Sequence, residues 1–192
     1  MEIRTATKED LSRIMELGEE FNHLMVYQKD RMMMEQYLDR ILVAETYVGE
    51  QTVSDGYSGT LREVEIVGYY HYIVSSDPGF EEMLRCYRQF PEELIHGAIY
   101  GLPYPAHTIR DRFPELCVIM QGACHREVAR LFYEHLMNLY PEIWVYCSIK
   151  SNKPETYKEL GFTFDPKEQS TFFNVSKGDK STYQLGRWKK GD

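Results

Sequence analysis

The residues with the most evident chemistry lie together near the middle of the chain. Residues 122–130 read GACHREVAR, and the residues after them repeat apolar side chains at helical spacing. The segment therefore predicts a turn that leads into the N-terminus of a helix. Backbone N–H groups at such a terminus have no partner within the helix and can bind an anion. A cysteine thiol at such a position, beside cationic side chains, can act as a nucleophile, so Cys124 is a second candidate.

Thiol chemistry is the less favoured of these two interpretations. His125 follows Cys124 directly, which is poor spacing for a Cys–His pair, and no nucleophile elbow surrounds the thiol. His125 and His135 lack the HExxH pattern, so no metal site is predicted. The four cysteines are widely spaced, without a CxxC pair, and are expected to be reduced thiols. Anion binding is the better interpretation of this turn.

Predicted strands flank the helix that follows the turn. Residues 115–121 (ELCVIMQ) predict a buried strand and residues 142–148 (EIWVYCS) predict a second one. Residues 152–162 then predict a short helix that ends at Gly161. Two strands joined through a helix make a right-handed βαβ unit, which places the helix N-terminus at the carboxyl edge of a parallel strand.

The rest of the chain predicts a single α/β domain with no linker. Thr7 and Asp10 resemble a capping box before a helix that runs to about residue 26, and Asp30 can cap a second helix whose apolar face reaches Ile41. The other predicted elements are strands at 2–6, 40–48 and 62–76, a loop at 50–60, a sixth strand at 161–168, and a hairpin of 170–176 with 181–188.

Residues 78–112 are longer than a turn requires. They predict a short helix over 80–90, another from Pro91, and an irregular stretch rich in aromatic residues and proline over 101–115. An ordered insertion of this size is either functional, as a lid or an interface, or a packed surface elaboration. Its aromatic and histidine side chains could close over a cleft or form a homodimer contact; they are Tyr100, Tyr104 and His107.

Composition narrows the classes of function. The chain is 43% hydrophobic with a net charge of −8, which is typical of a folded protein and disfavours binding to nucleic acid. No apolar run is long enough to span a membrane and no signal peptide is evident, so the cytoplasm is the expected compartment. The charge suits a cationic partner, such as an amine substrate or a basic peptide, although a generally acidic surface explains it equally well.

Three patterns together resemble the GNAT superfamily, the Gcn5-related N-acetyltransferases. The first is the opening Ile3-Arg4-x-Ala6-x-x-x-Asp10 before an apolar helix, and the second is the central strand–turn–helix. The third is Tyr157-x-x-x-Gly161-Phe162 behind a strand, similar to the family's Tyr-x-x-x-Gly-Phe. The resemblance covers most of the chain except about residues 78–112.

The resemblance implies one GNAT-like domain over residues 1–192, of the α/β class. Its sheet would be mixed, mostly antiparallel, splayed between the fourth and fifth strands and flanked by helices. Residues 78–112 would form a helical insertion between the third and fourth strands. Acetyl-CoA, or another acyl-CoA, would be the co-substrate and would lie in the opening of the sheet.

The resemblance also implies where the cofactor would bind. Its pantetheine arm would pair with the fourth strand around Val118 to Met120, and its diphosphate would lie on amides of the following turn. The cofactor residues of the turn and of the later helix would be Gly122, His125, Arg126, Glu127, Val128, Ala129 and Asn152. Asn152 could instead help to start the helix that Pro154 opens.

The turn departs from the family's Gln/Arg-x-x-Gly-x-Gly/Ala pattern. Alignment places Cys124 at the first position, Glu127 at the glycine position and Ala129 at the last, and only Ala129 fits. Glu127 favours the helix dipole but repels a phosphate, unless Arg126, Arg130 or His125 offsets its charge.

Tyr157 matches the family's general acid, because a phenol can donate a proton to a departing thiolate. The alternative is a tyrosine that packs under the sheet. The sequence does not identify a general base. Glu115 and His71 are the better placed acceptors, each alternatively a surface carboxylate or a satisfied sheet histidine, and an ordered water could relay the proton instead.

Two functions remain open at this stage. The first is an acyl-CoA-dependent N-acyltransferase that transfers an acyl group, expected to be acetyl, to the amine of a small molecule or peptide. The second is a catalytically decayed GNAT-fold binding or structural protein that acts through its insertion. In the family, substrate selection usually falls to segments that here contain Asn22, His23, Tyr27 and residues 172–183.

Overall fold

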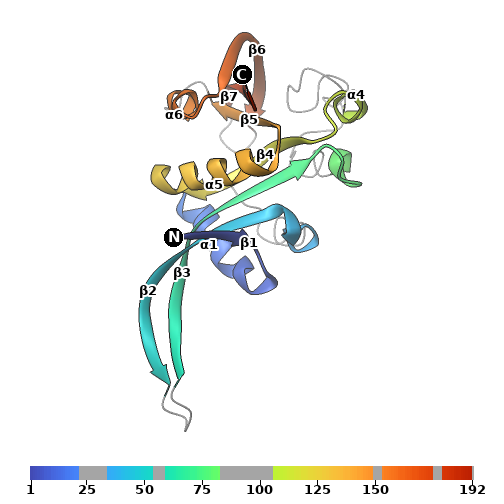
Figure 1. Ribbon diagram of the computed structural model, residues 1–192. Helices are drawn as coiled ribbons and strands as arrows, with labels where there is room; N and C mark the ends of the chain where they lie inside the picture. Colours follow the sequence, from blue (N-terminus) through green and yellow to red (C-terminus); the bar gives the residue numbers. More distant parts are fainter. Residues whose placement is uncertain (22–33, 54–58, 83–105, 149–152, 175–178, 192) are drawn as a thin grey trace. The chain divides into compact units, whose positions relative to one another are not determined.

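A computed structural model describes residues 1–21, 34–53, 59–82, 106–148, 153–174 and 179–191 (Figure 1). Within these residues the chain forms a seven-stranded sheet of order β1-β2-β3-β4-β5-β7-β6, with a parallel β4–β5 pair among antiparallel ones. The predicted mixed, mostly antiparallel sheet with flanking helices is confirmed. The elements are β1 (Glu2–Thr5), η1 (Lys8–Asp10), α1 (Leu11–Glu20), η2 (Leu38–Arg40), β2 (Ile41–Val53), β3 (Gly59–Val74), α4 (Ala106–Arg112), β4 (Leu116–Cys124), α5 (Arg126–Leu139), β5 (Glu142–Ser148), α6 (Lys153–Glu159), β6 (Thr163–Asn174) and β7 (Asp179–Lys189).

The chain divides into two compact units. Unit 1 comprises Met1–His71 and Gly122–Phe132, and unit 2 comprises Tyr72–Gln121 and Tyr133–Asp192. β3, β4 and α5 each contribute residues to both units.

The core of unit 1 lies between α1 and the first strands of the sheet. Apolar residues of α1 recur every three or four positions and are fully or almost fully buried, as Leu11, Ile14 and Leu17 show. This spacing places them on one side of the helix, where they pack with β-strand residues such as Val43 and Tyr69. The apolar periodicity therefore predicted the buried face of α1 correctly.

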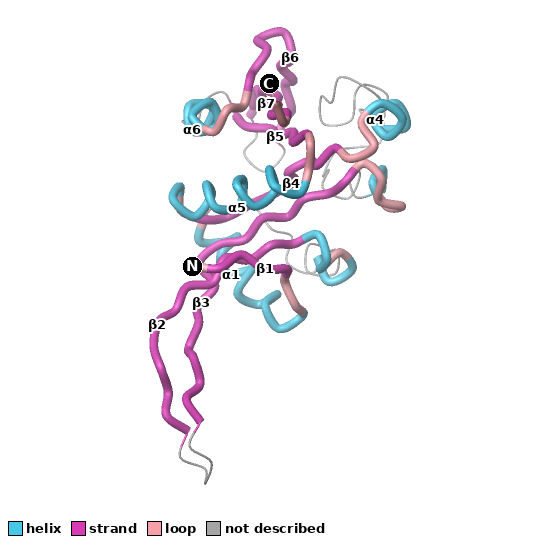
Figure 2. The backbone as a smooth tube through the Cα atoms, viewed as in Figure 1, coloured by secondary structure: helices cyan, strands magenta, loops and turns pink. Residues whose placement is uncertain are grey.

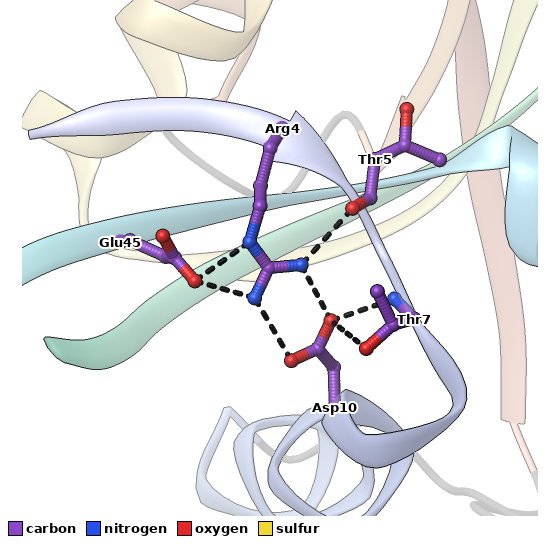
Figure 3. Close-up of polar contacts among 5 residues, drawn as sticks. All are labelled: Arg4, Thr5, Thr7, Asp10 and Glu45. Atoms are coloured by element: carbon purple, nitrogen blue, oxygen red, sulfur yellow. Dashed lines mark hydrogen bonds and ion pairs between the residues drawn. The ribbon is translucent and has the colours of Figure 1, made fainter.

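A charged network holds the start of α1 against β1 and β2 (Figure 3). The guanidinium of Arg4 donates to both carboxylate oxygens of Asp10, at 2.6 and 3.0 Å, and to Glu45 at 2.6 Å. The Thr7 N–H donates to Asp10 at 2.7 Å, which forms the predicted capping box. The Arg4 and Asp10 of the opening pattern thus have a structural role in this fold, because together they join the first strand to the first helix.

The boundaries of the first two helices differ from the prediction. α1 ends at Glu20, and the predicted continuation to residue 26 falls outside the described residues beyond Phe21. The second helix was predicted to reach Ile41, but Ile41 begins β2 and pairs with His71. An apolar residue such as Ile41 satisfies the helical and the strand period alike, so the pairing decides between them.

The predicted loop over residues 50–60 is wrong at both of its ends, whereas residues 54–58 lie outside the described part of the chain. β2 continues to Val53 and β3 begins at Gly59, and the two strands pair up to Val53↔Gly59 (Figure 2). Two irregularities in the β2–β3 ladder accommodate extra residues, one of them between Tyr47 and Gly49. Polar and glycine residues resemble a loop in sequence, but the cross-strand hydrogen bonds of a long hairpin recruit them into strands.

Unit 2 is built on β4, β5, β7 and β6. The fully buried Trp144 of β5 packs its ring at 5.1 Å from Phe113, and the guanidinium of Arg187 on β7 lies 4.7 Å from the Trp144 ring centroid. β6 corrects a second prediction, because residues 163–174 form one strand where two were predicted, over 161–168 and 170–176; residues 175 and 176 lie outside the described residues. Its ladder with β7 is irregular between Phe164 and Gln169, where Pro166 has no N–H to contribute.

The helical insertion between β3 and β4 is anchored at both ends. Ser75, just after β3, donates through its hydroxyl to the Phe113 carbonyl and accepts from the Leu116 N–H at 3.2 Å. Arg110 of α4 donates to the Ser75 carbonyl at 3.3 Å. The predicted irregular chain over 101–115 therefore includes a helix, α4, which carries the exposed His107. Of the three prolines that suggested irregular chain, Pro103 and Pro105 precede this helix and Pro114 follows it, so none lies within it.

Most of the insertion, residues 83–105, falls outside the described residues. The predicted helices over 80–90 and from Pro91, with Tyr100 and Tyr104, belong to that part of the chain, apart from a helical turn at 80–82.

Candidate functional site

The parallel strands β4 and β5 separate within unit 2. Their ladder runs from Leu116↔Glu142 to Ile119↔Val145, and among the described residues it ends there. β5 meanwhile continues to pair with β7 as far as Ser148. The predicted splay of the sheet between its fourth and fifth strands is thus present in the backbone.

The separation divides the two predicted pantetheine contacts. Val118 lies inside the ladder, opposite Trp144, and is buried. Met120 lies one residue past the last pair and is half-buried. A strand that has lost its neighbour presents backbone N–H and C=O groups on that edge. Met120 is therefore better placed than Val118 to pair with an extended ligand.

In unit 1, β4 leads almost directly into α5. Only His125 separates Cys124, the last residue of β4, from Arg126, the first of α5. The Ala129 N–H donates to the His125 carbonyl at 3.0 Å, which is the first i→i−4 hydrogen bond of the helix. The N–H groups of residues 126–128 come before it and therefore have no acceptor within the helix. The helix N-terminus lies where the sequence indicated, whereas the predicted turn from Gly122 is shorter than expected, because residues 122–124 belong to β4.

Charged side chains surround this helix start. His125, Arg126, Glu127 and Arg130 are exposed, whereas Val128 is buried and Ala129 is half-buried. Arg126 and Arg130 are four residues apart and lie on one side of the helix. Backbone donors with two guanidinium groups form a donor set that suits a diphosphate, and the exposed Glu127 opposes it.

Gly122 has a packing role that the sequence did not reveal. A Cβ atom at this position would lie 2.3 Å from two atoms of the Tyr70 ring. The Tyr70 ring is itself held by Phe132, at 4.7 Å between ring centroids in an edge arrangement. The missing side chain of Gly122 thus makes room for a buried aromatic pair, which accounts for this glycine without a phosphate.

A second glycine lets β3 approach the end of β4 closely. A Cβ at Gly68 would lie 2.5 Å from the Cβ of Cys124 and 3.2 Å from Val128. Cys124 is half-buried in this contact, which leaves the thiol a packing role. Gly68 was missed in the sequence because its requirement comes from residues more than fifty positions away.

His125 has an aromatic neighbour within unit 1. Its ring lies edge-on to Phe21 at 5.3 Å between centroids. Phe21 follows α1 directly and donates its N–H to the Leu17 carbonyl at 3.1 Å. The contact joins the predicted phosphate turn to the end of the first helix, although the two are about a hundred residues apart in sequence.

Tyr157, Gly161 and Phe162 form the C-terminus of α6. The Phe162 N–H donates to the Tyr157 carbonyl and the Gly161 N–H to the Lys158 carbonyl, both at 3.0 Å. Gly161 has a φ of 88°, in the left-handed region. These bonds define a Schellman motif, in which the residue after the glycine packs on the third residue before the helix end. The Tyr157 and Phe162 rings do so, 5.5 Å apart.

The ring of Tyr157 is buried in an aromatic cluster of unit 2. Tyr133 of α5 lies 5.3 Å from it and Phe164 of β6 lies 6.4 Å from it, between centroids. Only 8% of Tyr157 is exposed. The backbone and the ring of Tyr157 therefore both serve the fold. A chemical role would belong to its hydroxyl alone.

The two candidate bases have opposite environments. Glu115 is exposed just before β4, as expected of a surface carboxylate. His71 on β3 is fully buried, and burial lowers its pKa to about 3. A neutral imidazole in the interior agrees with the sheet histidine alternative.

Some predicted residues lie outside the described part of the chain. These are Asn152, Asn22, His23 and Tyr27. Within the described part, no group of three or more His, Cys, Asp or Glu residues could hold a metal ion. A search for helices long and apolar enough to cross a membrane, limited to the same residues, found none.

The fold of this chain is similar to the fold of the GNAT-type N-acetyltransferases. A polyamine N-acetyltransferase of Drosophila melanogaster, which catalyses the formation of N-acetylagmatine, matches with a TM-score of 0.58 over 98% of this chain and 99% of that chain, at 12% identity. NAA60 of Arabidopsis thaliana in complex with acetyl-CoA matches with a TM-score of 0.57 over 99% and 98%, at 11% identity.

An N-acetyltransferase from Staphylococcus aureus Mu50 has the highest identity of these three, 18%, with a TM-score of 0.55 over 98% of this chain and all of that chain. No protein-family model matches the sequence. No curated protein matches it either. Similarity to known proteins is therefore carried by the tertiary structure.

Proposed function

We propose that this protein is an acyl-CoA-dependent N-acyltransferase that transfers an acetyl group to the amine of a small molecule or a peptide. The observation that carries the proposal is the end of the β4–β5 ladder at Ile119, followed along the same chain segment by the exposed start of α5. One strand edge and one helix N-terminus in succession suit an extended ligand that ends in phosphates.

Each part of this segment has a proposed role in holding acetyl-CoA. The backbone of Met120 pairs with the pantetheine arm, whereas the N–H groups of residues 126–128 and the exposed Arg126 and Arg130 bind the diphosphate. When bound, the thioester supplies an activated acetyl group. The protein lowers the barrier chiefly by positioning, because orienting two reactants in one site removes much of the entropic cost of reaction.

Tyr157 is the proposed general acid, through its hydroxyl. Its carbonyl and ring are engaged in the Schellman motif and the aromatic cluster, which hold the side chain in one orientation. A fixed phenol can donate its proton to a leaving thiolate. His71 is not proposed as the base, since a fully buried imidazole cannot reach an incoming amine. A water molecule is the proposed relay for the amine proton.

The acceptor is proposed to be a cationic amine, in line with the net charge of −8. The neighbours in structure include enzymes whose acceptors are a small amine and a ribosomal protein, and both classes stay candidates. The cytoplasm remains the expected compartment, in line with the wide spacing of the four cysteines in the sequence.

A decayed GNAT-fold protein that binds a partner through its insertion is the second candidate. Two observations favour it. Gly122 is explained by its packing against Tyr70, and an exposed carboxylate, Glu127, stands in the first turn of α5. Calorimetric titration with acetyl-CoA distinguishes the candidates, because only the enzyme requires binding. No heat of binding at millimolar acetyl-CoA would rule out the acyltransferase.

The role of Tyr157 is tested by removing its hydroxyl. We expect Tyr157→Phe to keep stability and acetyl-CoA affinity while kcat falls about 10²-fold or more, since general acid catalysis typically contributes that much. Turnover is followed as release of free CoA with agmatine and with an amino-terminal peptide as acceptors.

Tyr133→Phe is the matched control, because it removes a hydroxyl from the same aromatic cluster. Equal loss in both variants would show that the cluster matters for packing only. Glu127→Gln completes the set: removal of its charge is expected to strengthen acetyl-CoA binding several-fold, and unchanged affinity would place the diphosphate elsewhere.

A further inference from the structure

β2 and β3 extend past the rest of unit 1 as a two-stranded arm (Figure 1). We define the β2–β3 arm as residues 46–53 and 59–65. β1 pairs with β2 only from Leu42 to Glu45, so among the described residues the outer edge of β2 has no neighbouring strand from Thr46 onward. Unpaired strand edges of this length are templates for pairing with another chain. An isolated two-stranded hairpin is also only marginally stable in water.

The arm exposes apolar side chains. Tyr47 is 54% exposed, Val48 51% and Val64 50%. They are three of the five exposed large apolar residues in the described part of the chain. Tyr47 and Val64 are cross-strand partners and therefore share one face of the arm, while Val48 lies at the irregularity between Tyr47 and Gly49. A cluster of exposed apolar groups on an open edge indicates an interaction site.

Carboxylates lie on the opposite face of the arm from this apolar pair, because successive residues of a strand alternate between faces. Glu63 and Glu65 flank Val64 in the sequence and are exposed. Arg13 of α1 lies 3.7 Å from Glu65 and also contacts Glu16 and Glu20, so three carboxylates share one guanidinium. The surface beside the arm is therefore negatively charged.

We propose that the open edge of β2 on the arm binds an extended, basic segment of a partner protein. Apolar residues of that segment cover Tyr47 and Val64, and its alternating Lys or Arg residues face the carboxylates. Pairing at the β2 edge supplies main-chain hydrogen bonds, and the alternation supplies specificity. A second copy of this chain is a poorer occupant, because it would bring a second acidic arm against the first. The inference does not depend on the acyltransferase proposal.

The test uses the full chain and a fluorescein-labelled octapeptide of alternating Lys and Val. Two peptides serve as comparisons: one with Glu in place of Lys, and one with four Lys followed by four Val. Fluorescence anisotropy is expected to show micromolar binding of the alternating Lys peptide, weakened by added salt, and at least tenfold weaker binding of both comparisons.

Val64→Lys is expected to weaken binding of the alternating peptide at least tenfold, because it removes an apolar contact and adds a like charge. Leu139→Lys is the matched control, since Leu139 is 56% exposed on α5 and belongs to unit 2 rather than to the arm, and this variant should bind as the wild type does. Tyr47→Lys gives a second, independent variant. Thermal melts and acetyl-CoA titrations of all variants should match those of the wild type.

Three outcomes would overturn the proposal. One is equal binding of the alternating and the block peptides, which would indicate general charge attraction. Another is binding that Val64→Lys and Tyr47→Lys leave unchanged. The third is a concentration-dependent dimer in sedimentation that Val64→Lys abolishes, which would make a second copy the occupant.

Discussion

At the level of single residues, the chain shows how one amino acid can satisfy two demands. Tyr157 closes a helix through its carbonyl and fills a core through its ring, and neither task uses the hydroxyl. Arg4 and Asp10 belong to the opening pattern that resembled an enzyme family, yet their contacts join β1 to α1. A residue pattern that is typical of a family can therefore reflect contacts that stabilise the fold rather than residues that take part in chemistry. His71 was considered as a candidate base, but it is fully buried, and its burial affects the stability of the fold instead.

The burial of His71 predicts how stability depends on pH. Burial lowers its pKa to about 3, whereas an unfolded histidine titrates near its ordinary value of 6.5. Between these values the unfolded chain binds a proton that the folded chain does not, so the histidine's contribution is complete above pH 6.5 and is lost as pH falls toward 3. The slope from this one group is about 1.4 kcal/mol per pH unit.

Urea unfolding at pH 7, 6 and 5 measures this slope. His71→Gln should reduce the pH dependence by that amount, whatever its effect on stability at pH 7. His107→Gln, at an exposed position of α4, should retain the wild-type slope. An unchanged slope in His71→Gln would mean that His71 is not the group responsible.

At the level of secondary-structure elements, the ends of helices and strands determine the candidate site. β4 loses its neighbour after Ile119, and α5 begins within a few residues of that point. α6 ends in a Schellman motif that positions Phe162 on Tyr157. Glycine is required at these ends for two different reasons. Gly122 is required because a side chain would collide with Tyr70, and Gly161 because its backbone is left-handed.

Gly161→Ala tests the termination of α6. A side chain at Gly161 would have ordinary contact with Trp188, at 3.5 Å, so space is not limiting. The expected cost is that of a left-handed L-residue, about 1–2 kcal/mol of unfolding free energy in urea. Gly191→Ala has nearly the same φ, 89°, but lies in open space at the chain end, where the backbone can relax. Equal effects of the two variants would contradict the argument.

At the level of the whole molecule, the sequence predicted a single domain, whereas the structure divides into two compact units. Three elements run through both units, namely β3, β4 and α5. Unfolding of one unit would remove part of each shared element and so weaken the part that remains in the other unit. We therefore keep the prediction of one domain and expect one cooperative transition.

Cooperativity is measured with a probe in each unit. Both tryptophans, Trp144 and Trp188, belong to unit 2 and report its unfolding by fluorescence. Native-state hydrogen exchange of α1 amides reports unit 1. The fluorescence and far-UV circular dichroism midpoints in urea should coincide, and α1 should exchange with the global free energy. Separate midpoints would show two domains.

Local pattern alone determined much of this protein. The start of the helix after Cys124, the apolar face of α1 and the helix end at Gly161 were all predicted in place, because each depends on residues within one or two turns of each other. The succession of strands and helices along most of the chain could be predicted for the same reason. The candidate site was predictable as far as its segment, residues 116–130, and its charges.

Only the tertiary structure decided the remainder. The described residues of the predicted loop, 50–53 and 59–60, are in strands because each has a cross-strand partner, and two predicted strands merged into β6 because β7 pairs with both. The reasons for Gly122 and Gly68 lie in Tyr70 and Cys124, which are distant in sequence. Strand register and burial depend on contacts between residues that are distant in sequence, so the local periodicity of apolar residues does not predict them.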